Sequence, residues 1–181
     1  MVDDRQSPGM SSVDAASAGA TVRRRLRSLA VMELLNVALQ AGLWFGLVGL
    51  PVTVANLIGY GLFAVLLLEG ATYWLAKLRQ LRGRRPHLPG VRVFRAARVV
   101  NPAILAAGLL ITGRAVFADP GRASWPGLAF ALFAVLEHVN YFHVQLMHDT
   151  VADLRRLRSV GLRRSHLARD LARAAPGQGP H

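Results

Sequence analysis

Three glutamates interrupt long apolar stretches of this chain, and they are the residues best suited to chemistry. Glu33, Glu69 and Glu137 each lie within a block of about twenty mostly apolar residues. A carboxylate inside a membrane-spanning helix costs ~3 kcal/mol on insertion scales, so such residues normally face the interior of a protein and mark a structural or functional site. We therefore expect the three carboxylates to form the centre of an intramembrane polar site.

Further polar side chains follow each glutamate at helical spacing. A tyrosine at i+4 follows the second and third glutamates, and an asparagine at i+3 follows the first and third. Residues at these spacings share one face of a helix. The site is therefore predicted between the second and fourth helices, with a third carboxylate from the first helix. Its predicted residues are Glu33, Asn36, Glu69, Tyr73, Glu137, Asn140 and Tyr141.

Carboxylate and imidazole groups together are also ligands for iron, manganese or zinc. The candidate metal ligands are Glu69, Glu137, His138 and His143. Diiron helix bundles place a histidine three residues after a glutamate. Thr72 and Asn140 occupy those positions, so the spacing argues against a diiron centre. A membrane metalloenzyme remains one alternative, and the favoured interpretation includes no cofactor.

The elements that must position these residues are helices in a membrane. Hydrophobic residues make up 52% of the 181 residues, mean hydropathy is +0.32, and cysteine is absent. About twenty apolar residues match the ~30 Å hydrocarbon core of a bilayer, in which open strands would leave backbone groups unpaired. The predicted class is all-α, an integral membrane four-helix bundle. The predicted helices are about 29–50, 52–75, 97–117 and 125–146.

The distribution of positive charge predicts the orientation. The N-terminal tail carries five Lys or Arg residues, the connector 77–98 carries eight, and the C-terminal tail from Arg155 carries seven. The two short turns contain only Arg114 and Arg122. Because cytoplasmic loops are enriched in Lys and Arg, both termini and the central connector are expected in the cytoplasm, and the protein in the plasma (inner) membrane.

The two ends of the chain differ from its centre. The composition of residues 1–22, rich in Ser, Ala and Gly, predicts a disordered tail. The predicted membrane domain covers residues 23–149, and a basic amphipathic tail is predicted for residues 150–181. The arginines of these tails are expected to contact anionic lipid headgroups. No nucleic-acid motif accompanies them, so nucleic acid is not an expected partner.

An internal repeat is predicted at an offset of 68 residues. This offset superimposes Glu69 on Glu137 and Tyr73 on Tyr141, and it also pairs Gly59 with Gly127. In the preceding helices, Asn101 takes the position of Glu33. Both repeats would begin and end in the cytoplasm, so they would form two tandem parallel hairpins related by an axis along the membrane normal.

The function class that follows is a small, multi-pass, non-enzymatic membrane protein with a duplicated Glu-Tyr polar site. Two alternatives stay open at this stage: a proton- or cation-coupled transporter and the membrane metalloenzyme. A homodimer is compatible with each, and a transporter would need one, because four helices seldom enclose a transport pathway.

Overall fold

The computed structural model describes residues 12–144 and 165–174, and these residues form helices and no strand. The all-α prediction is therefore confirmed for the described part of the chain. The elements are α1 (Ser12–Ala41), the π-helix η1 (Gly42–Leu47), α2 (Val54–Arg82), α3 (Val91–Ala118), α4 (Trp125–Phe142) and α6 (His166–Arg173).

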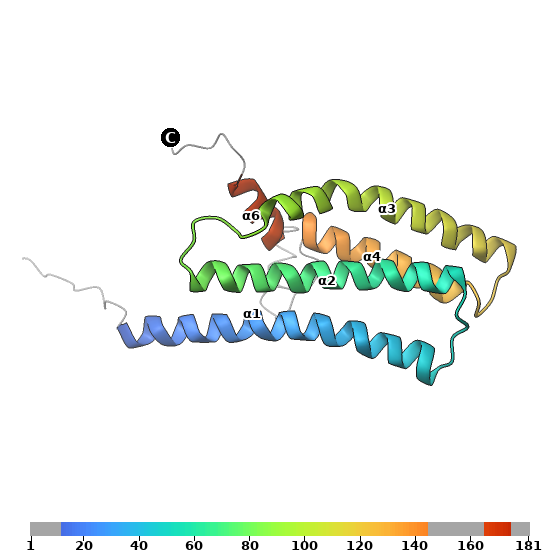
Figure 1. Cartoon of the computed structure of the whole chain (residues 1–181), viewed down its shortest axis with the longest axis horizontal. Helices are drawn as coiled ribbons and strands as arrows, with labels where there is room; N and C mark the ends of the chain where they lie inside the picture. Colours follow the sequence, from blue (N-terminus) through green and yellow to red (C-terminus); the bar gives the residue numbers. More distant parts are fainter. Residues whose placement is uncertain (1–11, 145–164, 175–181) are drawn as a thin grey trace, which may run out of the picture.

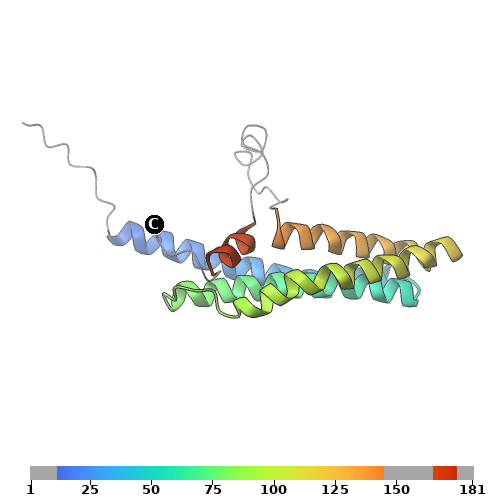
Figure 2. The same ribbon diagram turned by 90° about the horizontal axis from the view of Figure 1, so that it is seen from above.

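Helices α1 to α4 run side by side, and α6 lies near the start of α3 and the end of α4, while α1 and α2 extend past it (Figures 1 and 2). Helix α2 packs against α1, α3 and α4, and α6 packs against α3 and α4 and contacts α2 through side chains. Local signals set the limits of α2 and α3. The Thr53 hydroxyl accepts a hydrogen bond from the backbone N–H of Asn56 at 3.2 Å and caps α2. Gly90, with a φ of +75°, reverses the chain before α3, a conformation that favours glycine.

Within the described residues, three helical segments are long and apolar enough to cross a membrane: Ser17–Leu47, Val54–Arg82 and Val91–Ala118. Helix α4 is not among them. Its 18 residues span ~27 Å, and they include Glu137, His138 and Asn140, which lower its hydropathy. The predicted fourth span continued to residue 146, but α4 ends at Phe142, and residues 145 and 146 lie outside the described part of the chain.

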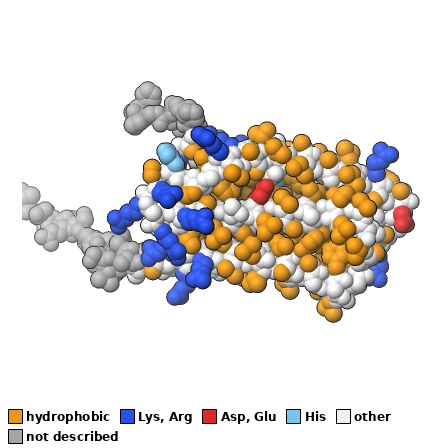
Figure 3. All heavy atoms as spheres, viewed as in Figure 1, with side chains coloured by type: hydrophobic (Ala, Val, Ile, Leu, Met, Phe, Trp, Pro, Cys, Tyr) orange, Lys and Arg blue, Asp and Glu red, His pale blue; other side chains and the backbone are white. Residues whose placement is uncertain are grey.

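The outer surface of these helices is apolar and the positive charge is concentrated at one end. Only 6% of the most apolar part of the first segment is buried, and Phe117 on α3 is 91% exposed. Figure 3 shows hydrophobic side chains over the middle of one face and most of the Lys and Arg side chains at the end where α6 lies. This is the surface expected of a protein that contacts lipid.

Two glycines allow α2 and α4 to touch through their backbones. A Cβ atom added to Gly59 would lie 1.9 Å from the carbonyl oxygen of Gly127, and one added to Gly127 would lie 2.2 Å from that of Ala55. Beside this crossing, the fully buried amide of Asn56 donates to the carbonyls of Pro51 at 2.9 Å and Arg122 at 3.0 Å. It also accepts from the Gly127 N–H at 2.9 Å. Small residues at the contact permit this close approach.

Two predictions about the tails differ from the structure. Helix α1 begins at Ser12, so residues 12–22 are helical and not part of a disordered tail; residues 1–11 lie outside the described residues. The amphipathic C-terminal segment does contain a helix, α6, but its apolar residues Leu167 and Leu171 are buried against protein. The physical reason is that Leu167 and Leu171 join a buried cluster of apolar side chains from the long helices. The apolar face of α6 therefore packs against protein.

Candidate functional site

The predicted site residues separate into three polar clusters at contacts between helices. Two clusters hold the three glutamate carboxylates, and the third ties α6 to α2. No Lys or Arg forms an ion pair with Glu33, Glu69 or Glu137 within the described residues. Neutral donors are therefore the only partners that the described residues offer to these carboxylates.

The first cluster joins α1 to α4. The Tyr141 hydroxyl donates a hydrogen bond to Oε1 of Glu33 at 2.5 Å. Asn140 donates to Oε2 of Glu137 at 3.4 Å, and the Glu137 and Glu33 carboxyls are close enough to interact electrostatically with each other and with Tyr141. The carboxyl groups of Glu33 on α1 and Glu137 on α4 thus both interact with the Tyr141 hydroxyl group.

Tyr141 reaches Glu33 because α2 carries a glycine where the ring passes. A Cβ atom added to Gly70 would lie 2.4 Å from the Tyr141 hydroxyl oxygen and 2.5 Å from the ring carbon that bears it. Any larger residue at position 70 would occupy the volume of the tyrosine. Gly70 is therefore a positioning residue of this cluster.

The second cluster joins α2 to α3. The amide of Asn101 donates to Oε2 of Glu69 at 2.7 Å, and the Asn101 side chain is 5% exposed. This length is typical of a strong hydrogen bond to a carboxyl oxygen. The first and second clusters therefore each link a carboxyl group to a polar side chain on a different helix.

The third cluster involves Tyr73, which the sequence assigns to the same site as Glu69. Its hydroxyl donates instead to Oδ2 of Asp170 on α6 at 3.0 Å. The Lys77 ammonium lies 2.9 Å and 2.8 Å from the two oxygens of the same carboxylate. Asp170 thus receives three short contacts from α2, and these orient α6 on the bundle.

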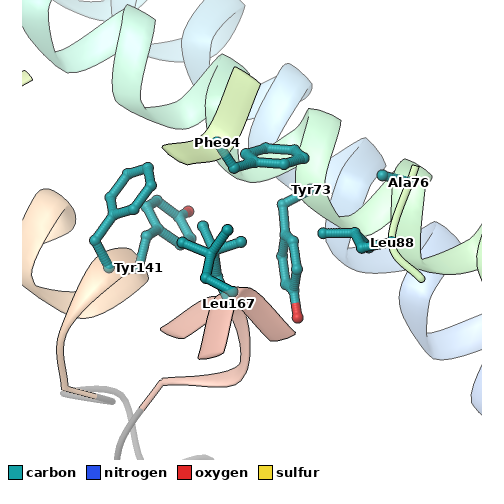
Figure 4. Close-up of a cluster of buried hydrophobic side chains, with 8 residues drawn as sticks. Tyr73, Ala76, Leu88, Phe94, Tyr141 and Leu167 are labelled. Carbon is teal, nitrogen blue, oxygen red and sulfur yellow. The ribbon is translucent and has the colours of Figure 1, made fainter. Parts of the chain in front are cut away.

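Apolar packing surrounds this third cluster. Leu167 of α6 inserts among Tyr73 of α2, Phe94 of α3 and Tyr141 of α4 (Figure 4). At the ends of α6, the Ser165 hydroxyl donates to the Tyr141 carbonyl at 2.5 Å, and Arg95 donates to the carbonyl of Ala174. Helix α6 therefore packs beside the end of α4, against α2 and α3.

Asn36 does not reach the carboxylates. It accepts a hydrogen bond from Gln40 at 3.4 Å, and Gln40 in turn accepts from the Trp44 indole at 2.7 Å. These contacts run along the α1–η1 segment only. The polar face predicted for the first helix is thus divided between Glu33, which pairs with α4, and a separate chain of local bonds.

The predicted metal ligands are also dispersed. Glu69 is paired with Asn101 on α3, whereas Glu137 belongs to the first cluster. The rings of His138 and His143 are 5.5 Å apart, and His138 stacks on Phe142. The described residues contain no group of three or more His, Cys, Asp or Glu side chains that could hold a metal ion.

Four residues that build these clusters were not among the predicted site residues, namely Gly70, Lys77, Asn101 and Asp170. Asp170 is the only acidic residue after Asp153, and it lies between Leu167 and Leu171 on the apolar face of α6. A lone carboxylate on an apolar face is a signal that it pairs inside the protein. Gly70 carries no comparable signal, because its role depends on which helix crosses it.

Comparison of the chain with protein-family models, with curated proteins and with solved structures finds no match.

Proposed function

We propose that this chain is a multi-pass integral protein of the plasma membrane, with both termini and the 83–90 loop in the cytoplasm. Three apolar spans and the lipid-compatible outer surface support membrane insertion. Helix α4 crosses with them as the fourth span, since ~27 Å nearly matches the ~30 Å hydrocarbon core. The concentration of Lys and Arg at the α6 end supports the cytoplasmic assignment of that end (Figure 3).

Two tandem hairpins, α1–α2 and α3–α4, make up this four-helix bundle. A twofold axis between parallel repeats brings equivalent residues into contact with each other where they lie on the axis. Gly59 and Gly127 are equivalent at the 68-residue offset, and their backbones touch. The Asn101–Glu69 hydrogen bond and the electrostatic interaction of Glu33 with Glu137 join equivalent positions, because Glu33 is equivalent to Asn101 and Glu137 to Glu69. The tyrosines break this symmetry, since Tyr141 donates to Glu33 whereas its equivalent Tyr73 donates to Asp170.

The two carboxylate clusters fasten one hairpin to the other, and the protein is a non-enzymatic membrane component built around this duplicated site. The single observation that carries this conclusion is the Tyr141–Glu33 hydrogen bond of 2.5 Å between the first and fourth helices. Interhelical hydrogen bonds in membranes contribute ~0.6 to 2 kcal/mol each, so two clusters would select one arrangement of the hairpins.

Paired variants test this role. Tyr141→Phe removes the donor and is expected to lower the thermal stability of the detergent-purified chain. Glu33→Gln keeps an acceptor for the Tyr141 hydroxyl and removes only the titrating group, so it is expected to retain most of the stability. Equal stability of Tyr141→Phe and the unsubstituted protein would contradict the fastening role.

A proton- or cation-coupled carrier is the second candidate. It is favoured by the proximity of Glu33 and Glu137 in a cluster to which the described residues bring no Lys or Arg. Two carboxyls that interact electrostatically in a low-dielectric site bind a proton or a cation in preference to remaining fully charged. A carrier would show a proton-linked flux in proteoliposomes that Glu33→Gln abolishes without a loss of stability. The fastening role predicts no flux in either protein.

A further inference from the structure

Helix α1 is the least covered of the three apolar segments. Only 6% of the most apolar part of its segment is buried inside the chain, against 44% for α2 and 28% for α3. Among the described helices α2 is its main neighbour, whereas α3 packs against α2, α4 and α6. One side of α1 is therefore left without a protein partner within the described residues.

The contacts of α1 show which side this is. Ala30 is 1% exposed, and the Val37 carbonyl accepts a hydrogen bond from the Tyr60 hydroxyl of α2 at 2.7 Å. Met32 and Leu39 stand two residues after Ala30 and Val37, and residues two apart point to nearly opposite sides of a helix. Met32 and Leu39 are accordingly 61% and 65% exposed.

The uncovered side of α1 has the residue spacing of a coiled coil. Leu29, Met32, Asn36 and Leu39 follow one another at intervals of three, four and three residues, and Leu43 continues the pattern at the start of η1. We call these five residues the α1 seam. Such spacing is the a/d pattern of helices that pack in parallel, and Asn36 takes an a position, where one asparagine fixes register and oligomeric state.

Asn36 is the hydrogen-bonding residue of the α1 seam. Its oxygen accepts from Gln40 at 3.4 Å, but its amide nitrogen has no acceptor within the described residues. Along the helix axis it lies ~14 Å from Arg27 and ~17 Å from Leu47, which is near the centre of the bilayer in the proposed membrane location. An amide is complementary to itself, because it carries both a donor and an acceptor. The Asn36 side chain of a second copy would therefore supply the missing acceptor.

We propose that two copies of this chain associate through the α1 seam, with their Asn36 amides hydrogen-bonded to each other across a twofold axis along the membrane normal. Both copies insert in the same orientation, so their α1 helices run parallel. The inference rests on the proposed membrane location, because in water the solvent would satisfy the amide. Helices associate in lipid through side-chain packing and hydrogen bonds, and the α1 seam supplies both. The arginines of α1 all precede Leu29, so their mutual repulsion stays at the aqueous end.

Cross-linking of single cysteines tests the contact, and the chain has no native cysteine to interfere. Met32→Cys places a thiol in the α1 seam. Leu34→Cys is the matched control, because Leu34 is also exposed, at 44%, and lies on the opposite side of the helix at almost the same depth. A disulfide requires Cα atoms ~4.4–6.8 Å apart. Oxidation of the membranes with copper phenanthroline should convert the Met32→Cys chain into a covalent dimer and leave the Leu34→Cys chain monomeric.

Asn36→Leu tests the hydrogen bond itself. Fluorescence energy transfer between purified copies labelled at the N-terminus, in phosphatidylcholine vesicles at decreasing protein-to-lipid ratios, gives the dissociation constant of the dimer. Loss of one interhelical hydrogen bond should raise this constant about threefold to thirtyfold. Thr72→Val is the control and should leave it unchanged, because the exposed Thr72 hydroxyl donates to the Leu68 carbonyl of its own helix at 2.7 Å.

Three results would overturn the inference: equal cross-linking of the two cysteine variants, a monomer at every protein-to-lipid ratio, or an unchanged dissociation constant for Asn36→Leu. Extraction of the membranes at alkaline pH separates this failure from a failure of the proposed membrane location. A chain that stays in the membrane without cross-linking would overturn the dimer alone, whereas release of the chain would overturn both.

Discussion

Replacing Gly59 by alanine should loosen the crossing of α2 and α4. The added Cβ would lie 1.9 Å from the backbone oxygen of Gly127, and two backbones cannot relieve this contact by a side-chain rotation. Overpacking of this kind costs up to ~3 kcal/mol, of which the better helix propensity of alanine returns ~1 kcal/mol. The net loss is therefore ~2 kcal/mol.

The matched control is Gly61→Ala on the same helix, because a Cβ there would meet nothing within 4 Å. For a chain of this size, ~2 kcal/mol corresponds to a fall of ~4–8 °C in Tm, measured by circular dichroism of the full chain in detergent. Gly61→Ala should leave Tm unchanged or raise it slightly. If the two variants had the same Tm, the backbone contact between α2 and α4 would be refuted.

Three further results are expected. Gly70→Ala should displace the Tyr141 ring and lower stability by ~1–2 kcal/mol, and Tyr141→Phe should then add no further loss in that background; an additive loss would contradict the contact. Asp170→Asn should release α6 and speed hydrogen exchange of residues 166–173 about thirtyfold, for ~2 kcal/mol lost from a largely buried ion pair with Lys77; unchanged exchange would show that apolar packing alone holds α6. Reporters fused to the two termini should report from the cytoplasm, and one inserted in the turn 119–124 from the opposite side; the reverse result would refute the orientation.

The helices could be predicted because their signals are local. Length and hydropathy locate the apolar segments without any knowledge of their neighbours. The start of α1 at Ser12 could not be obtained in this way, since the Ser- and Ala-rich residues 12–22 have no apolar periodicity. The length of α4 was overestimated for a related reason: apolar residues continue past Phe142, and hydropathy alone does not show where the helix stops.

The site was predictable in composition but not in pairing. Helical spacing groups residues of one helix, and it identified Glu33, Glu137 and Tyr141 as members of polar faces. Helical spacing cannot give the rotation of one helix against another. It therefore could not show that Tyr73 pairs with Asp170 rather than with a glutamate, because this pairing depends on the docking of α6. The role of Gly70 could not be predicted from the sequence for the same reason.

The most direct test of the proposed duplicated polar site is a double-mutant cycle between α1 and α4. Tyr141→Phe, Glu33→Leu and the double variant would be unfolded in detergent, and the coupling free energy calculated from the three losses of stability. A hydrogen bond of 2.5 Å between these side chains predicts a coupling of ~0.6–2 kcal/mol. Losses that add to within ~0.3 kcal/mol would contradict the proposed role of this pair in joining α1 to α4.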